Sequence, residues 1–437
     1  MKTGWPIGAL LASVASVLVP GVSWAVLPSG GVMGVTDIGQ ADGVRKDWEG
    51  RGVALQLGWS NETAHNTQGG YRDATRQAGQ VVLGARLDLE RLWGWDNSQF
   101  QITVDKRYGS NVGDAAGLGT LMSVHEIHGR GQTWWLTNFY VDKQWRQGQV
   151  ALRVGKTPVG SDFGFDRCEF LNLTGCGSPP GNLEGGYWHN WPIGPWGARL
   201  QMATGAQSHL KLGVYQVNRR YTDDAWAQDN GWKLSNPSGT EGALIPLELG
   251  WTPRLHGLPG HHRFGVWLST AGGDDLRVDS DGLPLALEQG RARHHERTHG
   301  AYVSLQQQLT GEADAAGLYG FLNLTRANGR VARVDRQVAV GMVYRQLPWR
   351  MADSAGMVAG VTAASEDHAR FVRQWNAPHP GALREVAGGS EKVVEAFYLW
   401  QPQPWLGIRP SVQYIARPGG GDKDDALVLG IKTDVTF

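Results

Sequence analysis

Beyond its first 25 residues, the sequence lacks any apolar run of the roughly 18 residues that a membrane-spanning helix requires. The longest candidate, residues 355–364, is short and is interrupted by Gly356 and Gly360. Full charges are also scarce. They make up 19% of the 437 residues, against roughly 25% in an average globular domain, and they sum to zero. The first absence excludes a helical membrane protein. The second argues against a nucleic-acid-binding protein, which needs a basic surface.

Cysteine is nearly absent, since Cys168 and Cys176 are the only two in the chain. Without a second cysteine pair or a suitably spaced histidine set, a zinc site has too few ligands, so we expect no metal and no cofactor. In an exported chain, two neighbouring cysteines favour a disulfide that closes a small loop, and a free or metal-binding pair is the alternative. A Gly-x-Ser-x-Gly elbow is also missing. We therefore expect no catalytic residue and no enzymatic activity.

The first 25 residues have the pattern of a cleaved export signal. Lys2 supplies the positive start, an apolar stretch covers residues 7–19, and Ser23 and Ala25 provide the small residues of a cleavage site. An uncleaved membrane anchor is the alternative. We assign residues 1–25 to the signal peptide and 26–50 to a periplasmic N-terminal segment, in which Val44 and Trp48 have helical spacing. Residues 51–437 form the main folded unit.

What the sequence contains many times over is strict alternation of apolar and polar residues. In residues 81–90, Arg86, Asp88 and Glu90 fall between apolar positions, and residues 100–105 and 427–437 repeat the pattern. A period of two means that successive side chains face opposite sides of a sheet. One face is then apolar and the other charged, which is typical of an antiparallel sheet that separates two different solvents.

Sixteen such stretches can be counted. They are 52–60, 80–90, 99–107, 133–144, 149–156, 196–204, 208–217, 242–251, 261–270, 299–309, 316–325, 335–345, 355–364, 392–401, 404–415 and 425–437. Short turns alternate with long links, which are 61–79, 108–132, 157–195, 218–241, 271–298 and 365–391. This alternation is typical of bacterial outer-membrane proteins. We predict an all-β fold, a sixteen-stranded antiparallel transmembrane β-barrel with long extracellular loops and short periplasmic turns.

Aromatic residues support a membrane location. The chain has 20 tryptophans, and seven lie beside the predicted short turns: Trp93, Trp95, Trp145, Trp251, Trp349, Trp400 and Trp405. Indole rings prefer the membrane–water interface, so these residues predict an aromatic girdle in contact with outer-membrane lipid. Packing inside a soluble β-sandwich is the alternative. The terminal Phe437 after an alternating strand resembles the signal that the barrel-assembly machinery reads.

The third long link, residues 157–195, is the expected constriction of the channel. It holds both cysteines, several prolines and a cluster of aromatic residues, so it can fold into the lumen as a stiff loop. Sugar transit requires apolar faces and planar hydrogen-bonding groups. Trp188 and Trp191 are therefore candidate contacts for a sugar.

The alternation also predicts which charged side chains point into the lumen. The basic ones are Arg86, Arg107, Arg153, Arg199, Lys211, Arg263, Arg409 and Lys432, and the acidic ones are Asp88, Glu90, Asp105, Glu248, Glu395 and Asp434. This near balance suits a neutral polar solute. The candidate solute contacts on the wall are Arg153, Arg199, Arg86, Arg107, Arg263 and Glu248, and the first two flank the constricting link. A salt bridge within the barrel is the alternative for each.

Several segments resemble the carbohydrate-selective porin family, also called the OprB family. The matching stretches are residues 152–156 with Asp162 and Phe163, 196–200, 213–218, 246–251, 258–261, 413–415, 418–420 and 425–430. Residues 38–45 depart from the family pattern, which usually has a Trp-Gly-Gly run there. The resemblance implies a sixteen-stranded outer-membrane sugar channel, with glucose the best-known substrate of relatives. It adds Asp162 to the candidate contacts.

These observations favour a passive, carbohydrate-selective porin that admits mono- or disaccharides. A general porin is one alternative, and a barrel for adhesion or polysaccharide export is another. A barrel enzyme would need a nucleophile–histidine pair that we do not find. Monomeric and homo-oligomeric barrels are both compatible with the sequence, and no nucleic-acid partner is expected.

Overall fold

The computed structural model describes residues 44–165, 168–184, 186–287, 290–379 and 389–436. The predicted signal peptide 1–25, most of the N-terminal segment 26–50 and Phe437 lie outside the described residues. The helix α1 (Val44–Gly50) belongs to the end of that N-terminal segment. Its periplasmic location stays a prediction.

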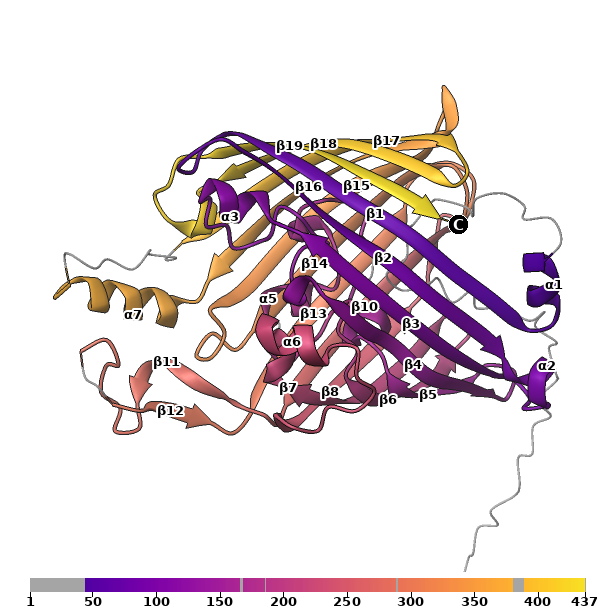
Figure 1. The fold of residues 1–437 in the computed structure, drawn as a ribbon, viewed down its shortest axis with the longest axis horizontal. Coiled ribbons are helices and arrows are strands. Elements are labelled where there is room, and N and C mark those ends of the chain that lie inside the picture. The colour runs from indigo at the N-terminus through magenta and orange to yellow at the C-terminus, as the bar shows by residue number, and fades with distance from the viewer. Residues whose placement is uncertain (1–43, 166–167, 185, 288–289, 380–388, 437) are drawn as a thin grey trace, which may run out of the picture.

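Sixteen antiparallel strands of the described chain close into one barrel (Figure 1). A seventeenth strand in the same sheet, β9 (Arg254–Leu255), only extends a short turn. Closure comes from pairing of the first strand with the last, for example Asn61 with Thr433. The barrel strands are β1 (Val53–Gln68), β2 (Ala74–Asp88), β3 (Ser98–Gly109), β4 (Trp134–Trp145), β5 (Val150–Lys156), β6 (Trp196–Gly205), β7 (Ser208–Asn218), β8 (Thr240–Trp251), β10 (Leu258–Ser269), β13 (Thr298–Gln308), β14 (Gly317–Ala327), β15 (Val334–Leu347), β16 (Arg350–Ala364), β17 (Ser390–Gln403), β18 (Leu406–Ala416) and β19 (Ala426–Thr436).

The predicted strand number is confirmed, but two boundaries near the N-terminus are wrong. Residues 61–79 are not a long link, because β1 and β2 continue until Asn66 pairs with Ala74 and leave only residues 69–73 between them. The outward positions there are polar, so the apolar alternation fades while the backbone ladder continues. The strand predicted to reach Glu90 ends at Asp88. The Asp88 side chain instead accepts the backbone N–H groups of Glu90 and Arg91 and starts α2 (Leu89–Trp93).

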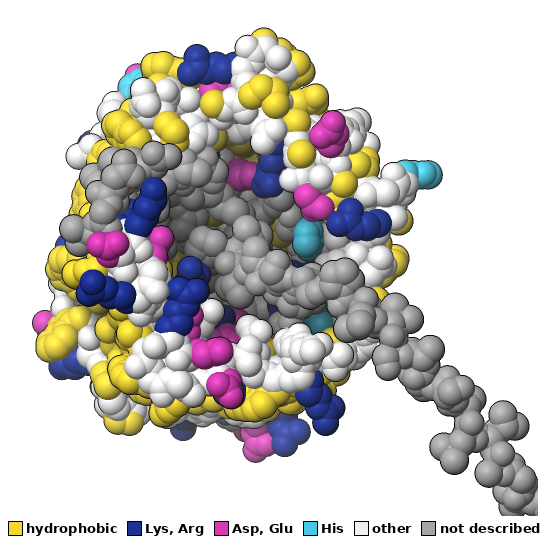
Figure 2. Space-filling view, turned by 90° about the vertical axis from the view of Figure 1, so that its right-hand side faces the viewer, with side chains coloured by type: hydrophobic (Ala, Val, Ile, Leu, Met, Phe, Trp, Pro, Cys, Tyr) yellow, Lys and Arg dark blue, Asp and Glu magenta, His cyan; other side chains and the backbone are white. Residues whose placement is uncertain are grey.

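The two faces of the barrel differ as the alternation predicts. In β19, Leu429 and Ile431 face outward and are 47% and 50% exposed, whereas Lys432 and Asp434 face inward and are 5% and 1% exposed. Figure 2 looks at the end of the barrel where α1 lies. Acidic and basic side chains gather there around the central hollow, and hydrophobic side chains gather at the perimeter. The outer wall therefore suits a hydrocarbon environment and the inner wall suits water.

Short turns lie at one end of the barrel and longer loops at the other, and we call these the turn end and the loop end (Figure 1). The seven tryptophans of the predicted girdle all lie in or beside the short turns. Loop-end elements are α3 (Val112–Ala116), the 3-10 turn η1 (Arg130–Gln132), η3 (Arg219–Thr222), α6 (Asp224–Asn230), the hairpin β11 (Gly273–Asp279) and β12 (Ala292–His295), α7 (Glu366–Asn376) and η4 (Pro418–Gly420). None of the helices in the described ranges is long and apolar enough to cross a membrane.

The link between β5 and β6, residues 157–195, lies inside the barrel and is called the third loop below. It contains α4 (Val159–Asp162), η2 (Leu173–Gly175) and α5 (Pro179–Leu183). Its aromatic residues pack on inward-facing aromatic residues of the wall. Phe165 stacks on Phe321, with ring centroids 5.5 Å apart, and Phe170 meets Phe397 edge-on at 5.1 Å. A large part of the buried apolar core is therefore the contact between this loop and the wall.

Candidate functional site

The third loop is held to the wall at its start by a buried ionic cluster around Asp162. Arg153 Nη1 lies 2.9 Å and Arg199 Nε 3.3 Å from Asp162 Oδ1, and the Tyr215 hydroxyl donates to Oδ2 at 2.9 Å. The same arginines reach Asp142 on β4, at 3.0 and 3.2 Å. Two carboxylates thus share two guanidinium groups, and one of these carboxylates belongs to the loop.

The charge on Asp162 is stabilised by this cluster. Burial would raise the pKa of Asp162, but its two arginine partners, Lys211 and the Tyr215 hydroxyl outweigh burial and lower the pKa below its usual value. The stabilisation is therefore present above the pKa of the unfolded chain and is lost only as the pH falls through the lower folded value. The tether persists at neutral pH.

A second tether lies at Gly164 of the loop. Glu248 on β8 accepts the Gly164 N–H at 2.9 Å and the Tyr302 hydroxyl at 2.7 Å, and Lys211 lies 3.1 Å from the same carboxylate. The Gly164 carbonyl accepts Arg263 Nη1 at 2.6 Å. Both backbone groups of one residue are thus held by wall side chains.

A third tether lies on the far side of the lumen. Glu395 on β17 accepts the backbone N–H groups of Leu171 and Asn172, each at 2.8 Å. The Asn172 side chain also donates to Gln413 on β18 at 3.0 Å. Together the three tethers stretch the loop from the β5–β8 wall to the β17–β18 wall. Open space is left beside β1, β2, β3, β18 and β19.

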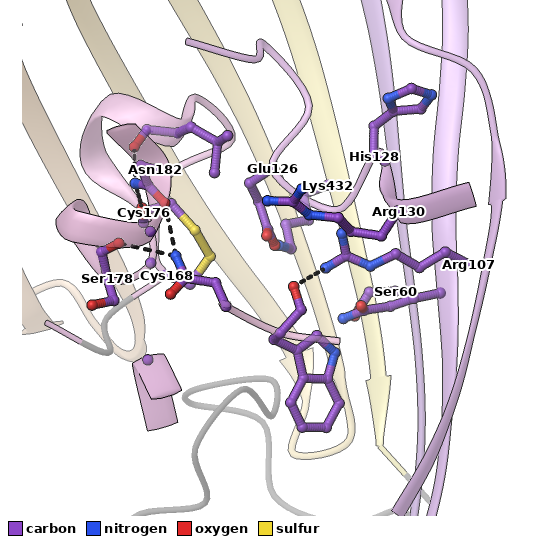
Figure 3. A pocket seen from close by; sticks show the side chains of 18 of the residues that line it. Ser60, Arg107, Glu126, His128, Arg130, Cys168, Cys176, Ser178, Asn182 and Lys432 are labelled. Atoms are coloured by element: carbon purple, nitrogen blue, oxygen red, sulfur yellow. Dashed lines mark hydrogen bonds and ion pairs between the residues drawn. A yellow bond between two sulfur atoms is a disulfide. The ribbon is translucent and has the colours of Figure 1, made fainter. Parts of the chain in front are cut away.

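That space is a pocket of about 390 Å³, within the range of roughly 300–1,000 Å³ that is usual for small-molecule sites. The third loop contributes neutral hydrogen-bonding groups to it, and the opposite side contributes charged ones (Figure 3). The loop side includes Ser161, Ser178, Asn182, Asn190 and Trp191. The opposite side includes Ser60, Gln80, Arg107, Arg409, Lys432 and Asp434 of the wall, Glu126, His128 and Arg130 of the second loop (residues 110–133), and Asp224 of α6.

Three basic residues of the pocket lie near carboxylates, and for Arg107 the partner is Asp105 at 3.9 Å. Lys432 lies 3.1 Å from Glu62 and 2.6 Å from Glu126. Arg409 lies 3.8 Å from Asp434, at a looser distance. The pocket therefore combines strong local charges with little surplus of either sign.

Several polar atoms of the pocket are left without a protein partner. Arg409 Nε and Nη1, Asp434 Oδ1 and Asn190 Oδ1 are buried, and none has a hydrogen-bond partner among the described residues. Buried polar groups normally have partners. Water or a solute with several hydroxyl groups can supply them here.

The structure separates the predicted site residues into two groups. Arg107 and Trp191 line the pocket and contact each other: Arg107 Nη2 donates to the Trp191 carbonyl at 3.4 Å. The others are not among the pocket-lining residues. Arg153, Arg199, Asp162, Glu248 and Arg263 belong to the tethers, Trp188 is fully buried against Trp267 and Tyr302, and Arg86 is exposed near the turn end.

Two basic residues were placed in the lumen by the alternation but were not chosen as solute contacts. Arg409 and Lys432 lie on β18 and β19, far along the chain from the third loop, yet they line the pocket opposite it. The amides Asn182 and Asn190 were missed altogether. Only the inward register of β18 and β19 could have indicated Arg409 and Lys432. No local pattern marks Asn182 and Asn190.

Cys168 and Cys176 form the predicted disulfide, which lines the same pocket. With a sequence separation of 8, its removal in the C168A/C176A double variant should lower the free energy of unfolding by about 2–3 kcal/mol, because a short closed loop is released in the unfolded chain. Denaturant unfolding in detergent measures this. Reduction of the native protein should reproduce the loss, and equal stabilities would contradict it.

Glu184, directly after α5, should make stability depend on pH. Burial raises its pKa to about 7, although Arg219 and other cations oppose the shift. An acid with a raised folded pKa destabilises the fold as the pH rises from about 4.5 to about 7. Glu184→Gln should therefore raise the unfolding temperature at about pH 8 and change it less at about pH 5. Exposed Glu312→Gln is the control, and parallel pH profiles for the native protein and Glu184→Gln would contradict the effect.

A closed sixteen-stranded barrel with an apolar outer wall, a charged inner wall and an internal loop beside a polar pocket defines a porin of the outer membrane. The chain belongs to the carbohydrate-selective porin, OprB family, whose model matches residues 72–437. The family resemblance of the sequence is thereby confirmed, and the departure at residues 38–45 lies before the matched range.

Two relatives span nearly the whole chain. Porin B of Pseudomonas aeruginosa is 35% identical over 418 residues, which cover 92% of this chain and 91% of that protein. A high-pH structure of Pseudomonas putida OprB is 33% identical with a TM-score of 0.86, and the match covers 90% of this chain and 96% of that one. The protein is a carbohydrate-selective outer-membrane porin, a channel and not an enzyme. Outer-membrane barrels have long extracellular loops and short periplasmic turns, so we expect the loop end to be extracellular and the turn end periplasmic.

Proposed function

We propose that small neutral sugars such as glucose diffuse through the gap between the third loop and the wall formed by β18, β19, β1, β2 and β3. The observation that carries this proposal is the pocket itself. It presents amide and hydroxyl groups on one side and buried, incompletely paired arginine and aspartate groups on the other. A neutral polyol can satisfy both kinds of group without bringing a charge of its own.

In this proposal, the predicted site residues act in two ways. Arg107 and Trp191 contact the sugar together with Arg409 and Asn190. Arg153, Arg199, Asp162, Glu248 and Arg263 set the width of the gap, because they hold the third loop in place. Their direct contact with a sugar stays a prediction, as does that of Arg86 and Trp188. Trp188 supports the loop through its contact with Trp267 and Tyr302.

The balance of charge favours a neutral sugar over a sugar acid. Arg107, Arg409 and Lys432 are offset by Asp434 and Glu126 within the pocket and by Asp105 and Glu62 behind it. A carboxylate on the sugar would compete with these fixed anions for the same cations. Selectivity then comes from hydrogen-bond geometry at a narrow gap rather than from net charge.

Single-channel conductance in a planar bilayer, titrated with glucose, maltose and a sugar acid of glucose size, tests the proposal. We expect glucose to reduce the conductance at millimolar concentration and the sugar acid to do so no more strongly. Ion conductance without a sugar effect would replace the proposal with a general porin. Absence of a channel from folded protein would favour adhesion or polysaccharide export. The mass of the same purified protein in detergent shows whether the barrel is a monomer or a homo-oligomer.

A further inference from the structure

Three cations lie on the outer wall near the loop end of β14, β15 and β17, with β16 between the last two. Arg326 on β14, Arg336 on β15 and Lys392 on β17 are exposed, and the residues on either side of each in the strand are less exposed and mostly buried. Each therefore faces outward, toward the membrane. We call these three residues the basic band.

The basic band begins where the apolar outer wall ends. The next outward residues toward the membrane centre are Leu324, Val338 and Val394, which are among the exposed large hydrophobic residues. The periplasmic edge of the wall carries exposed tryptophans instead, such as Trp349 and Trp400. These three cations thus lie at the loop-end boundary of the apolar wall.

Two of these cations face each other directly. Arg326 and Arg336 are partners in the β14–β15 register, and like charges directly opposite on one face of a sheet are destabilising. Arg336 Nε lies 3.0 Å from Asp335 Oδ1, which neutralises part of that charge. The side chains of Arg326 and Lys392 form no hydrogen bond or ion pair with any described residue. The band therefore carries uncompensated positive charge.

Neighbouring groups leave the band open from the membrane side. The outward residues paired with the arginines on the flanking strands are small, Ala301 beside Arg326 and Ala363 beside Arg336. The carboxylates of the nearby helix α7 already have partners, since Glu366 pairs with Arg370 and Asp367 with Arg277. Asp335 offsets part of the charge of Arg336, and among the described residues no carboxylate pairs with Arg326 or Lys392.

From this arrangement we infer that the basic band binds the phosphate groups of a phosphorylated glycolipid in the outer leaflet, whose acyl chains lie along Leu324, Val338 and Val394. Paired guanidinium groups match phosphate oxygens by bidentate hydrogen bonding. A phosphate between Arg326 and Arg336 would convert a repulsive pair into an attractive bridge. The outer-leaflet glycolipid then contacts the β14–β17 sector of the barrel from the membrane side, whereas the sugar gap lies inside the barrel.

Binding of lipid A, the phosphorylated glycolipid part of lipopolysaccharide, to the purified full-length protein tests the inference. The two probes are diphosphorylated and dephosphorylated lipid A, and native mass spectrometry measures their binding. The variant R326Q/R336Q/K392Q removes the charge of the band, and Arg51→Gln, an exposed arginine at the periplasmic end, is the matched control. We expect roughly hundredfold weaker binding of the diphosphorylated probe by the triple variant and no change in the control. The dephosphorylated probe should bind all three proteins equally weakly.

Unchanged affinity in the triple variant would overturn the inference. So would full displacement of the glycolipid by millimolar inorganic phosphate, which would indicate a site for a free anion. The block of conductance by glucose, measured on the same triple variant, should equal that of the native protein. It shows that the variant is folded and separates this inference from the proposed sugar route.

Discussion

Replacement of Asp162 by asparagine should release the start of the third loop and raise the single-channel conductance severalfold. The substitution keeps the size of the side chain but removes the charge that Arg153 and Arg199 face at 2.9 and 3.3 Å. Breaking a buried ion pair from one side leaves an uncompensated charge, which costs about 3–5 kcal/mol. The third loop can avoid this cost by moving away from the wall, because it is not part of the hydrogen-bonded sheet that fixes the barrel strands. Conductance and its open-state noise are the measurements.

The matched control is Asp142→Asn. Asp142 shares the same two arginines at 3.0 and 3.2 Å, but it belongs to β4 and not to the loop. We expect a comparable loss of thermal stability in this variant with a conductance close to the native value. If Asp162→Asn conducts like the native protein, or if both variants conduct alike, the loop is not held by this cluster.

Substitution of Arg107 and Arg409 by glutamine should weaken the block by glucose without closing the channel. Arg107 and Arg409 lie at loose distances from their carboxylate partners, 3.9 Å from Asp105 and 3.8 Å from Asp434, so their guanidinium groups are available to a hydroxyl group. A hydrogen bond to a charged group contributes about 1.5–3 kcal/mol, which corresponds to roughly a 10- to 100-fold change in affinity. The glucose concentration for half-block should rise accordingly in each variant.

Arg345→Gln is the control for that experiment. Arg345 also points inward, but it pairs with Glu169 at 2.8 Å, stacks on Tyr319, and is not among the pocket-lining residues. We expect native glucose block in this variant. An equal effect of all three substitutions would mean that the lumen acts through its general charge and that the pocket does not bind the sugar.

Local patterns predicted the wall well and the site only in part. In β19 the alternation assigned Lys432 and Asp434 to the lumen, because the side of a strand on which a residue lies depends only on its position. The same rule gives no strand signal where the outward residues are polar. For this reason it did not predict that β1 and β2 extend into residues 61–79. It also could not show that Asp88 would cap a helix rather than continue a strand.

By itself, the sequence determined the sixteen-stranded barrel, most of its inward charges, the disulfide and the family, because each of these depends on short stretches of sequence or on matching motifs. Only the tertiary structure decided which inward charges meet the open pocket. That choice depends on the path of the third loop, which is set by contacts between residues far apart in the chain. Glu395, for example, holds Leu171 across 224 positions. Arg153 and Arg409 have the same local pattern, and only the loop between them makes one a tether and the other part of the pocket wall.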